Sequence, residues 1–91
     1  MLARRVFVSN RLGLHARAAA KLVRAASAFR SRVTLERADG GAASADAKSI
    51  LSVLTLAAAR GTELRVTAEG ADEEAALSAV VQLFEDKFGE E

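Results

Sequence analysis

Residues 63–84 read ELRVTAEGADEEAALSAVVQLF, and the spacing of their apolar residues changes part-way along. The first six residues alternate between polar and apolar, which predicts a strand with Leu64 and Val66 facing a core. After Gly70 the apolar residues recur every three or four positions, which predicts a helix with Asp72 as its N-cap. The stripe expected to be buried on this helix comprises Leu77, Val80, Val81, Phe84 and Phe88. This stretch is therefore a strand that leads directly into an amphipathic helix.

The same two spacings divide the rest of the chain. The alternating segments, which predict strands, are residues 5–9, 32–37 and, with poorer strand formers, 42–45. The segments with helical spacing are residues 16–28 and 49–58, the second opened by Ser49 as an N-cap. The element order is thus β-α-β-β-α-β-α. It predicts an α+β fold in which an antiparallel or mixed sheet carries all its helices on one face.

The composition indicates one small domain, residues 1–91, with 51% hydrophobic residues to form its core. Thirteen basic residues balance twelve acidic ones, which argues against a bulk electrostatic attraction to nucleic acid or anionic membranes. The absence of cysteine excludes disulfides, thiolate catalysis and Cys-ligated metals. No apolar run near the start is long enough for a signal peptide or a membrane span, so we expect a cytoplasmic protein. We also expect a monomer without a metal or a cofactor.

The chain has one histidine, His15, where a loop meets the helix predicted from residue 16. Unpaired backbone N–H groups and the helix dipole stabilise phosphate groups at such a position. Imidazole is a nucleophile near neutral pH, and Arg17 is close enough in sequence to contact a phosphoryl group on the ring. The other interpretation is an exposed or capping histidine. No Asp or Glu lies near His15 in sequence to orient it, which argues against hydrolytic or metal chemistry.

A second candidate site is Ser49, whose first expected role is to cap the short helix. A phosphate on a serine at this position is compatible with the helix, because the charge meets the favourable end of the dipole. The residues that follow, Ile50, Leu51 and Leu54, are more apolar than one buried face requires. They form either an exposed protein-binding patch or a short helix that is buried all round.

Three segments resemble motifs of the HPr family of histidine-containing phosphocarriers, in the same order and at the same distances. Residues 13–19, GLHARAA, are similar to the active-site signature of that family. Residues 48–61, KSILSVLTLAAARG, resemble its regulatory serine helix, and residues 70–77, GADEEAAL, resemble the start of its last helix. The resemblance covers almost the whole chain.

The resemblance implies an open-faced β-sandwich, in which a four-stranded antiparallel sheet lies under three helices. It also implies a carrier of the phosphoenolpyruvate-dependent phosphotransferase system rather than an enzyme that turns over a substrate alone. Enzyme I would phosphorylate His15 on Nδ1, Arg17 would contact the phosphoryl group, and a IIA-type domain would receive it. Ser49 would be the target of an HPr kinase/phosphorylase. The docking face would comprise Ala16, Ala20, Arg24, Lys48, Ile50, Leu51 and Leu54.

The sequence departs from the family pattern at a few positions. Ala18 stands where proline is usual, but alanine is a helix former, so we expect the helix to keep its start. Ser52 offers a kinase a second hydroxyl, one turn after Ser49. The ending LFEDKFGEE, residues 83–91, looks more like the nitrogen-related branch, whereas the segment around Ser49 looks like members with a regulatory serine. The branch, sugar uptake or regulation, therefore stays open.

Two other classes of protein fit the same element order. A ferredoxin-like regulatory or interaction module without phosphotransfer would leave His15 dispensable. A nucleic-acid-binding α+β domain would need exposed aromatic residues for stacking, and the predicted sheet offers none beyond Phe7. We therefore expect no nucleic-acid partner.

Overall fold

The computed structural model describes residues 1–40 and 43–90. The elements follow in the predicted order: β1 (Leu2–Phe7), α1 (Ala16–Ser27), β2 (Arg32–Arg37), β3 (Ser44–Asp46), α2 (Ile50–Thr55), β4 (Glu63–Glu69), α3 (Glu73–Glu85) and a short final turn, η1 (Lys87–Gly89). The first residue of the predicted weak strand, Ala42, lies outside the described residues. The remainder of that prediction overlaps β3.

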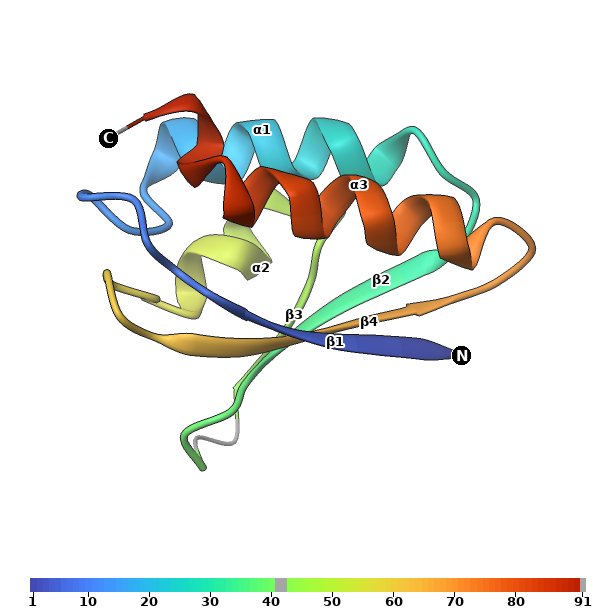
Figure 1. Ribbon diagram of the computed structural model, residues 1–91, viewed down its shortest axis with the longest axis horizontal. Helices are drawn as coiled ribbons and strands as arrows, with labels where there is room; N and C mark the ends of the chain where they lie inside the picture. The colour runs from blue at the N-terminus through green and yellow to red at the C-terminus, as the bar shows by residue number, and fades with distance from the viewer. Residues whose placement is uncertain (41–42, 91) are drawn as a thin grey trace.

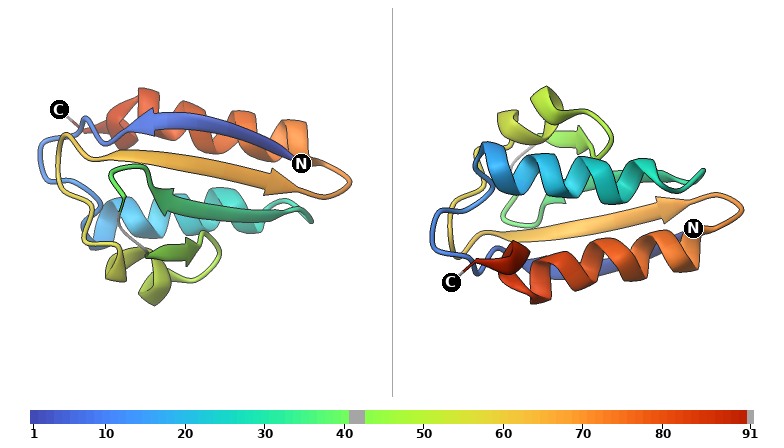
Figure 2. Two further views of the ribbon diagram at one scale, coloured as in Figure 1. Left: turned by 90° about the horizontal axis from the view of Figure 1, so that it is seen from below. Right: turned by 90° about the horizontal axis from the view of Figure 1, so that it is seen from above.

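The four strands form one antiparallel sheet in the order β1-β4-β2-β3. β4 pairs with both β1 and β2, so the strand with the clearest alternation in sequence lies inside the sheet. All three helices cover the same face, and α1 and α3 lie side by side and run in opposite directions (Figure 1, Figure 2). The predicted open-faced sandwich, a four-stranded antiparallel sheet under three helices, is confirmed.

The hydrophobic core lies between the sheet and the helices. The strands contribute the residues that alternation predicted, such as Val6 and Leu64, which lie opposite each other in β1 and β4 and are both buried. α1 contributes Leu22 and small side chains such as Ala19 and Ala26, all fully buried. Small residues on this side of α1 let the helix pack close to its neighbours. Among the described residues no helix has the length and apolar character needed to cross a membrane.

Two predicted boundaries were wrong. β1 begins at Leu2 and not at residue 5, because its first residues pair with the far end of β4, where Leu2 lies opposite Ala68. α2 ends at Thr55 and not near Ala58, because Ala57 has φ 50°, in the left-handed region that an α-helix excludes. The chain then turns away, and the Ala58 carbonyl accepts a hydrogen bond from Leu14 N–H at 2.9 Å.

Asp72 is the N-cap residue of α3, as predicted, but its side chain does not cap that helix. Its carboxylate accepts hydrogen bonds from the N–H groups of Arg30 and Ser31 and from the Ser31 hydroxyl, in the loop before β2. These bonds, the Ser31 hydroxyl first, lower the pKa of Asp72 to about 2. Glu73 reaches back instead and accepts from Gly70 N–H at 3.1 Å, which lowers the pKa of Glu73. Asp72 thus joins the start of α3 to the start of β2.

Phe88 is buried, as predicted, but it does not continue the stripe of α3. The helix ends at Glu85, and Lys87 and Phe88 then have φ values of 54° and 55°. This turn lays the Phe88 ring edge-on against Phe84, with ring centroids 4.9 Å apart and planes at 71°. The chain after α3 is thereby folded back toward the N-terminal end of α1.

Candidate functional site

The loop before α1, the segment after α2 and the end of the chain converge at one end of the molecule (Figure 1). Val8 N–H bonds to Thr62 O, and Leu14 N–H bonds to Ala58 O, both at 2.9 Å. Gly13 is required at this junction: its φ is 71°, and a Cβ there would lie 2.7 Å from the Ala58 oxygen. These backbone contacts between the loop before α1 and the segment after α2 fix the position of the residue that precedes α1.

That residue is His15, the N-cap of α1, as the sequence predicted. Its Nδ1 accepts a hydrogen bond from Arg17 N–H at 3.3 Å, so this nitrogen is turned toward the N-terminus of the helix. The His15 side chain is 26% exposed, which leaves it accessible to another protein. Nδ1 thus lies at the first turn of α1, where the helix dipole has its positive end.

The other ring nitrogen has a partner that the sequence analysis missed. Glu90 Oε2 lies 2.7 Å from His15 Nε2, and Glu90 Oε1 accepts a hydrogen bond from Asn10 Nδ2 at 3.1 Å. These contacts, that with Asn10 first, lower the pKa of Glu90. Glu90 is therefore not simply a solvated acidic residue near the end of the described chain. The carboxylate that is missing near His15 in sequence is supplied from 75 residues away.

The two contacts give the neutral imidazole a defined tautomer. A carboxylate accepts hydrogen bonds, so Nε2 carries the proton, whereas Nδ1 faces a donor and presents its lone pair. In this tautomer Nδ1 is the unprotonated nitrogen of the ring.

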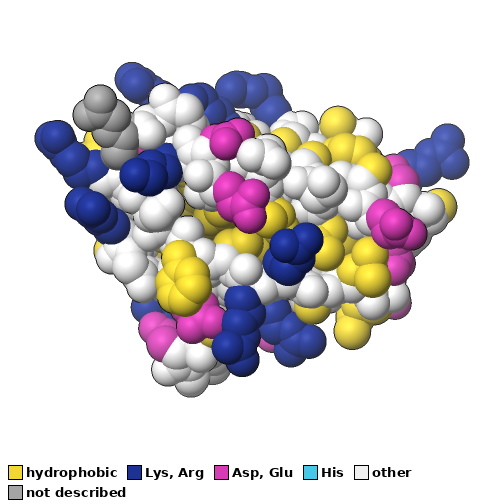
Figure 3. Space-filling model, viewed as in Figure 1, with side chains coloured by type: hydrophobic (Ala, Val, Ile, Leu, Met, Phe, Trp, Pro, Cys, Tyr) yellow, Lys and Arg dark blue, Asp and Glu magenta, His cyan; other side chains and the backbone are white. Residues whose placement is uncertain are grey.

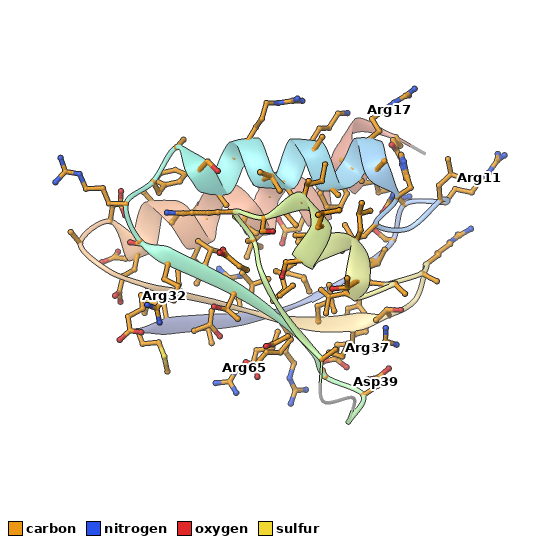
Figure 4. All side chains as sticks on the ribbon, turned by 180° about the vertical axis from the view of Figure 1, so that it is seen from behind. Arg11, Arg17, Arg32, Arg37, Asp39 and Arg65 are labelled. Carbon is orange, nitrogen blue, oxygen red and sulfur yellow. The ribbon has the colours of Figure 1, made fainter. Side chains whose placement is uncertain are left out.

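A cavity of about 450 Å³ adjoins the ring and is lined by Arg11, Leu12, His15, Arg17 and Glu90. The side chains of Arg17, from the start of α1, and of Arg11, from the preceding loop, both project outward at this end of the molecule (Figure 4). Sequence analysis found Arg17 through its spacing from His15 but did not single out Arg11. A cavity lined by two arginines beside an unprotonated ring nitrogen suits a phosphoryl group.

The family model for the phosphotransferase-system HPr component, described as its phosphorylation site, matches residues 2–86. The chain belongs to the HPr family. It is 46% identical over 91 residues to phosphocarrier protein HPr of Xylella fastidiosa (strain 9a5c), covering 100% of this chain and 99% of the relative. It is also 48% identical to phosphocarrier protein HPr of Treponema pallidum (strain Nichols), with 100% of both chains covered.

Two further comparisons bear on the branch and on the fold. Phosphocarrier protein NPr of Proteus mirabilis (strain HI4320) is 42% identical over 88 residues, 97% of this chain and 96% of the relative. The crystal structure of HPr-C-His from Thermoanaerobacter tengcongensis superposes with a TM-score of 0.91 at 41% identity, covering 100% of this chain and 99% of the other. Membership of the HPr family supports the general role of a phosphocarrier and disfavours the ferredoxin-like alternative. Because relatives named HPr and NPr both match, the branch stays open.

The apolar residues on α2 of this HPr-family protein are not buried all round. Within α2 only Val53 is fully buried, whereas Ile50 and Leu51 are 39% and 73% exposed and Leu54 is half-buried. On α1, Ala16 and Arg24 are exposed and Ala20 is half-buried. Acidic and basic side chains are interspersed on the face seen in Figure 3, in keeping with the net charge of +1. The structure thus favours the exposed patch over the buried helix.

Ser49 is the N-cap of α2, as predicted, and its Oγ accepts from Ser52 N–H at 3.4 Å. The Ser52 hydroxyl is engaged too, since it accepts from Asp46 N–H at 3.0 Å. Lys48 Nζ donates to Phe29 O at 2.7 Å, just past the C-terminal end of α1. The Lys48 ammonium group is therefore engaged in a hydrogen bond within the chain. The segment before α2 thus contacts one end of α1, and the segment after α2 contacts the His15 end. Ser49 immediately follows Lys48, whose side chain reaches the C-terminal end of α1.

Proposed function

We propose that this HPr-family protein takes a phosphoryl group from phospho-enzyme I on Nδ1 of His15 and passes it to a IIA-type acceptor. The observation that carries the proposal is the difference between the two ring nitrogens. Nε2 is bonded to the Glu90 carboxylate at 2.7 Å, while Nδ1 is turned to the start of α1 beside an open cavity. A cytoplasmic, monomeric carrier is part of this proposal.

In the proposed relay, the phosphoryl group is accepted and released at Nδ1 of His15, with help from the start of α1 and from Arg17. On acceptance, the Nδ1 lone pair forms a bond to phosphorus, and the electron pair of the breaking bond leaves with the donor. N–H groups at the start of α1 and the helix dipole stabilise the phosphoryl oxygens, and the Arg17 guanidinium adds a charge-assisted contact. On transfer, the bond from Nδ1 to phosphorus breaks and the acceptor forms the new one. The partner proteins supply the remaining transition-state stabilisation, so the carrier alone turns over nothing.

The exposed patch around the site supports docking of both partners on one surface. His15 is accessible at the end of α1, and the exposed Leu51 and Ile50 on the neighbouring α2 offer an apolar anchor. Exposed apolar residues of this kind mark protein-binding surfaces. Ala16, Ala20, Arg24 and Leu54 complete the proposed docking face, and Lys48 contributes through its stem, because its ammonium is bonded to Phe29.

Ser49 is proposed as a regulatory phosphorylation site for an HPr kinase/phosphorylase. The Ser49 hydroxyl bonds to Ser52 N–H, whereas the His15 ring bonds to Arg17 and Glu90, so a phosphate on Ser49 would act on partner docking and not through the contacts of the ring. Its added negative charge would stand next to Ile50 and Leu51, the apolar part of the docking face.

The test is the intact mass of wild type and His15→Ala after incubation with phosphoenolpyruvate and a bacterial enzyme I. We expect one acid-labile phosphoryl group on wild type and none on His15→Ala, because only His15 presents an unprotonated ring nitrogen. The variant should melt within a few degrees of wild type, which shows that it is folded. Phosphorylation of His15→Ala would refute the assignment, and an unmodified wild type beside a phosphorylated control HPr would refute the relay.

A further inference from the structure

We infer that Glu90 is the positioning residue of this site: it fixes which nitrogen of His15 takes the phosphoryl group and keeps the proton on the other nitrogen when that group leaves. The inference rests on the proposed function, in which His15 is the acceptor. Glu90 itself bonds only the far side of the ring, through Nε2, so it acts through His15.

The Glu90 carboxylate is held from two sides, unlike a surface ion pair. One oxygen faces His15 Nε2 at 2.7 Å, and the other accepts from Asn10 Nδ2 at 3.1 Å. Asn10 is fully buried, and the same Nδ2 also donates to Gly13 O at 2.7 Å. The Glu90 side chain is 17% exposed. The carboxylate is therefore tied to the same loop that sets the position of His15.

The backbone conformation of the C-terminal turn, residues 86–90, brings Glu90 next to the His15 ring. Lys87, Phe88 and Gly89 all have positive φ, so the chain reverses after α3. The buried Phe88 ring anchors the turn against α3, and Lys21 Nζ from α1 donates to Phe88 O at 2.6 Å. Two non-glycine residues in the left-handed region are unusual, and here the anchors on both helices oppose the strain.

The proton arrangement matters in both directions of the relay. On acceptance, a proton on Nε2 leaves Nδ1 unprotonated, so its lone pair can bond phosphorus once it is released from the Arg17 N–H. On donation, the electron pair of the Nδ1–phosphorus bond returns to Nδ1 while the proton stays on Nε2 beside Glu90. The leaving group is then neutral imidazole and not an imidazolate anion. A carboxylate that orients a histidine through its other nitrogen is a known way to fix the tautomer.

The negative charge of Glu90 lies near the place where an anionic phosphoryl group would arrive. Cations offset it: Arg11 and Arg17 line the same cavity, and the positive charge of Lys21 acts on Glu90. The carboxylate can therefore orient the ring without making the cavity repel phosphate.

The test compares Glu90→Ala and Glu90→Gln with a matched control, Glu74→Gln, an exposed acidic residue in the first turn of α3. Nitrogen-15 NMR of the imidazole, at a pH where the ring is neutral, reports which nitrogen carries the proton, with no partner present. We expect the proton on Nε2 in wild type and in the control, and a mixture of tautomers in Glu90→Ala. Glu90→Gln should give an intermediate mixture. Both carboxylate oxygens of Glu90 accept a hydrogen bond, one from His15 and one from Asn10, whereas the amide of glutamine has only one accepting oxygen.

Transfer kinetics give the second readout. The rates of acceptance from phospho-enzyme I and of transfer to a IIA domain should both fall about fivefold or more in Glu90→Ala, while the melting temperature falls by only a few degrees, because the Glu90 carboxylate also stabilises the fold at neutral pH. Equal spectra and equal rates in Glu90→Ala and wild type would overturn the inference. Should wild type itself accept no phosphoryl group, the proposed relay fails, and the NMR spectra alone then decide whether Glu90 sets the tautomer of His15.

Discussion

Arg17 has two contacts with the surroundings of His15, one through its backbone and one through its side chain. Its N–H donates to Nδ1, and Arg17 is also one of the residues that line the cavity beside the ring. Because a side-chain substitution keeps the backbone N–H, the two contributions can be separated. The orientation of the ring should survive in such a variant, and the contact with the phosphoryl group should be lost.

Arg17→Gln is therefore expected to accept a phosphoryl group on His15 about tenfold more slowly than wild type, since a charge-assisted contact to phosphate is lost. Stopped-flow or quenched-flow measurement with phospho-enzyme I gives the rate. The matched control is Arg65→Gln, on the outer face of the sheet (Figure 4), which should transfer like wild type. An equal loss in both variants would mean that overall positive charge, and not the position of Arg17, determines the rate.

The asymmetry of the His15 ring could be predicted from sequence only in part. A histidine at the start of a helix, two residues before an arginine, indicates a ring close to helix N–H groups, and only the resemblance to the HPr family implied Nδ1. Glu90 could not be found in this way, because neither periodicity nor motif spacing relates residues 75 positions apart. Arg11 was overlooked for a similar reason: it lies in an irregular loop whose path depends on the contact between Gly13 and Ala58.

At the scale of elements, α2 combines a capped start with an exposed apolar surface. Ser49 caps the helix, Val53 alone is fully buried within it, and Leu51 is 73% exposed. A helix of six residues is too short to be stable by itself, so the cap and the packing against α1 and β3 must hold it. Its surface can therefore change in charge without a change in fold, provided that the cap is kept.

Ser49→Asp should consequently slow phosphorylation of His15 by enzyme I while the melting temperature stays nearly unchanged. Aspartate is as good an N-cap as serine, so the helix is kept, whereas the new charge stands beside the docking residues. The control Ser49→Ala removes the cap and should lower the free energy of unfolding by about 0.5–2 kcal/mol with little change in the transfer rate. A transfer rate for Ser49→Asp equal to that of wild type would sink the regulatory proposal.

Hydrophobic spacing predicted the elements but not how they end. The alternation around Val66 and the helical stripe around Val80 follow from burial on one face, which the chain carries locally. The early end of α2 depends on the left-handed backbone of Ala57, and the reversal after α3 depends on Lys87 and Phe88. Alanine, lysine and phenylalanine give no sequence signal for positive φ, because that region costs them about 1–2 kcal/mol and is imposed by contacts elsewhere.

At the scale of the molecule, Asp72 links two distant parts of the chain. It accepts three hydrogen bonds from Arg30 and Ser31, and its pKa is lowered from 3.8 to about 2. A carboxyl group whose pKa is lower in the folded state stabilises the fold fully above the pKa of the unfolded chain. That contribution is lost as the pH falls from about 4 to about 2.

Urea unfolding at pH 6 and near pH 2.5 should therefore show a marked loss of stability in wild type on acidification. Asp72→Asn should be less stable than wild type at pH 6 and should lose less on acidification, because its amide does not titrate. Part of the loss should persist in the variant, since the pKa values of Glu73 and Glu90 are also lowered. An identical pH dependence in both proteins would show that Asp72 contributes nothing to acid sensitivity.

The pairing of His15 with Glu90 also has a consequence for the newly made chain. The ribosome adds about 5–20 residues per second, and 75 positions separate the two residues. His15 therefore exists for roughly 4 to 15 seconds before its carboxylate partner is synthesised. During that interval the ring has no Glu90 to hold the proton on Nε2, so an unfinished chain is a poor recipient for the relay. The orientation of the His15 ring by Glu90 thus begins only after residue 90 has been added.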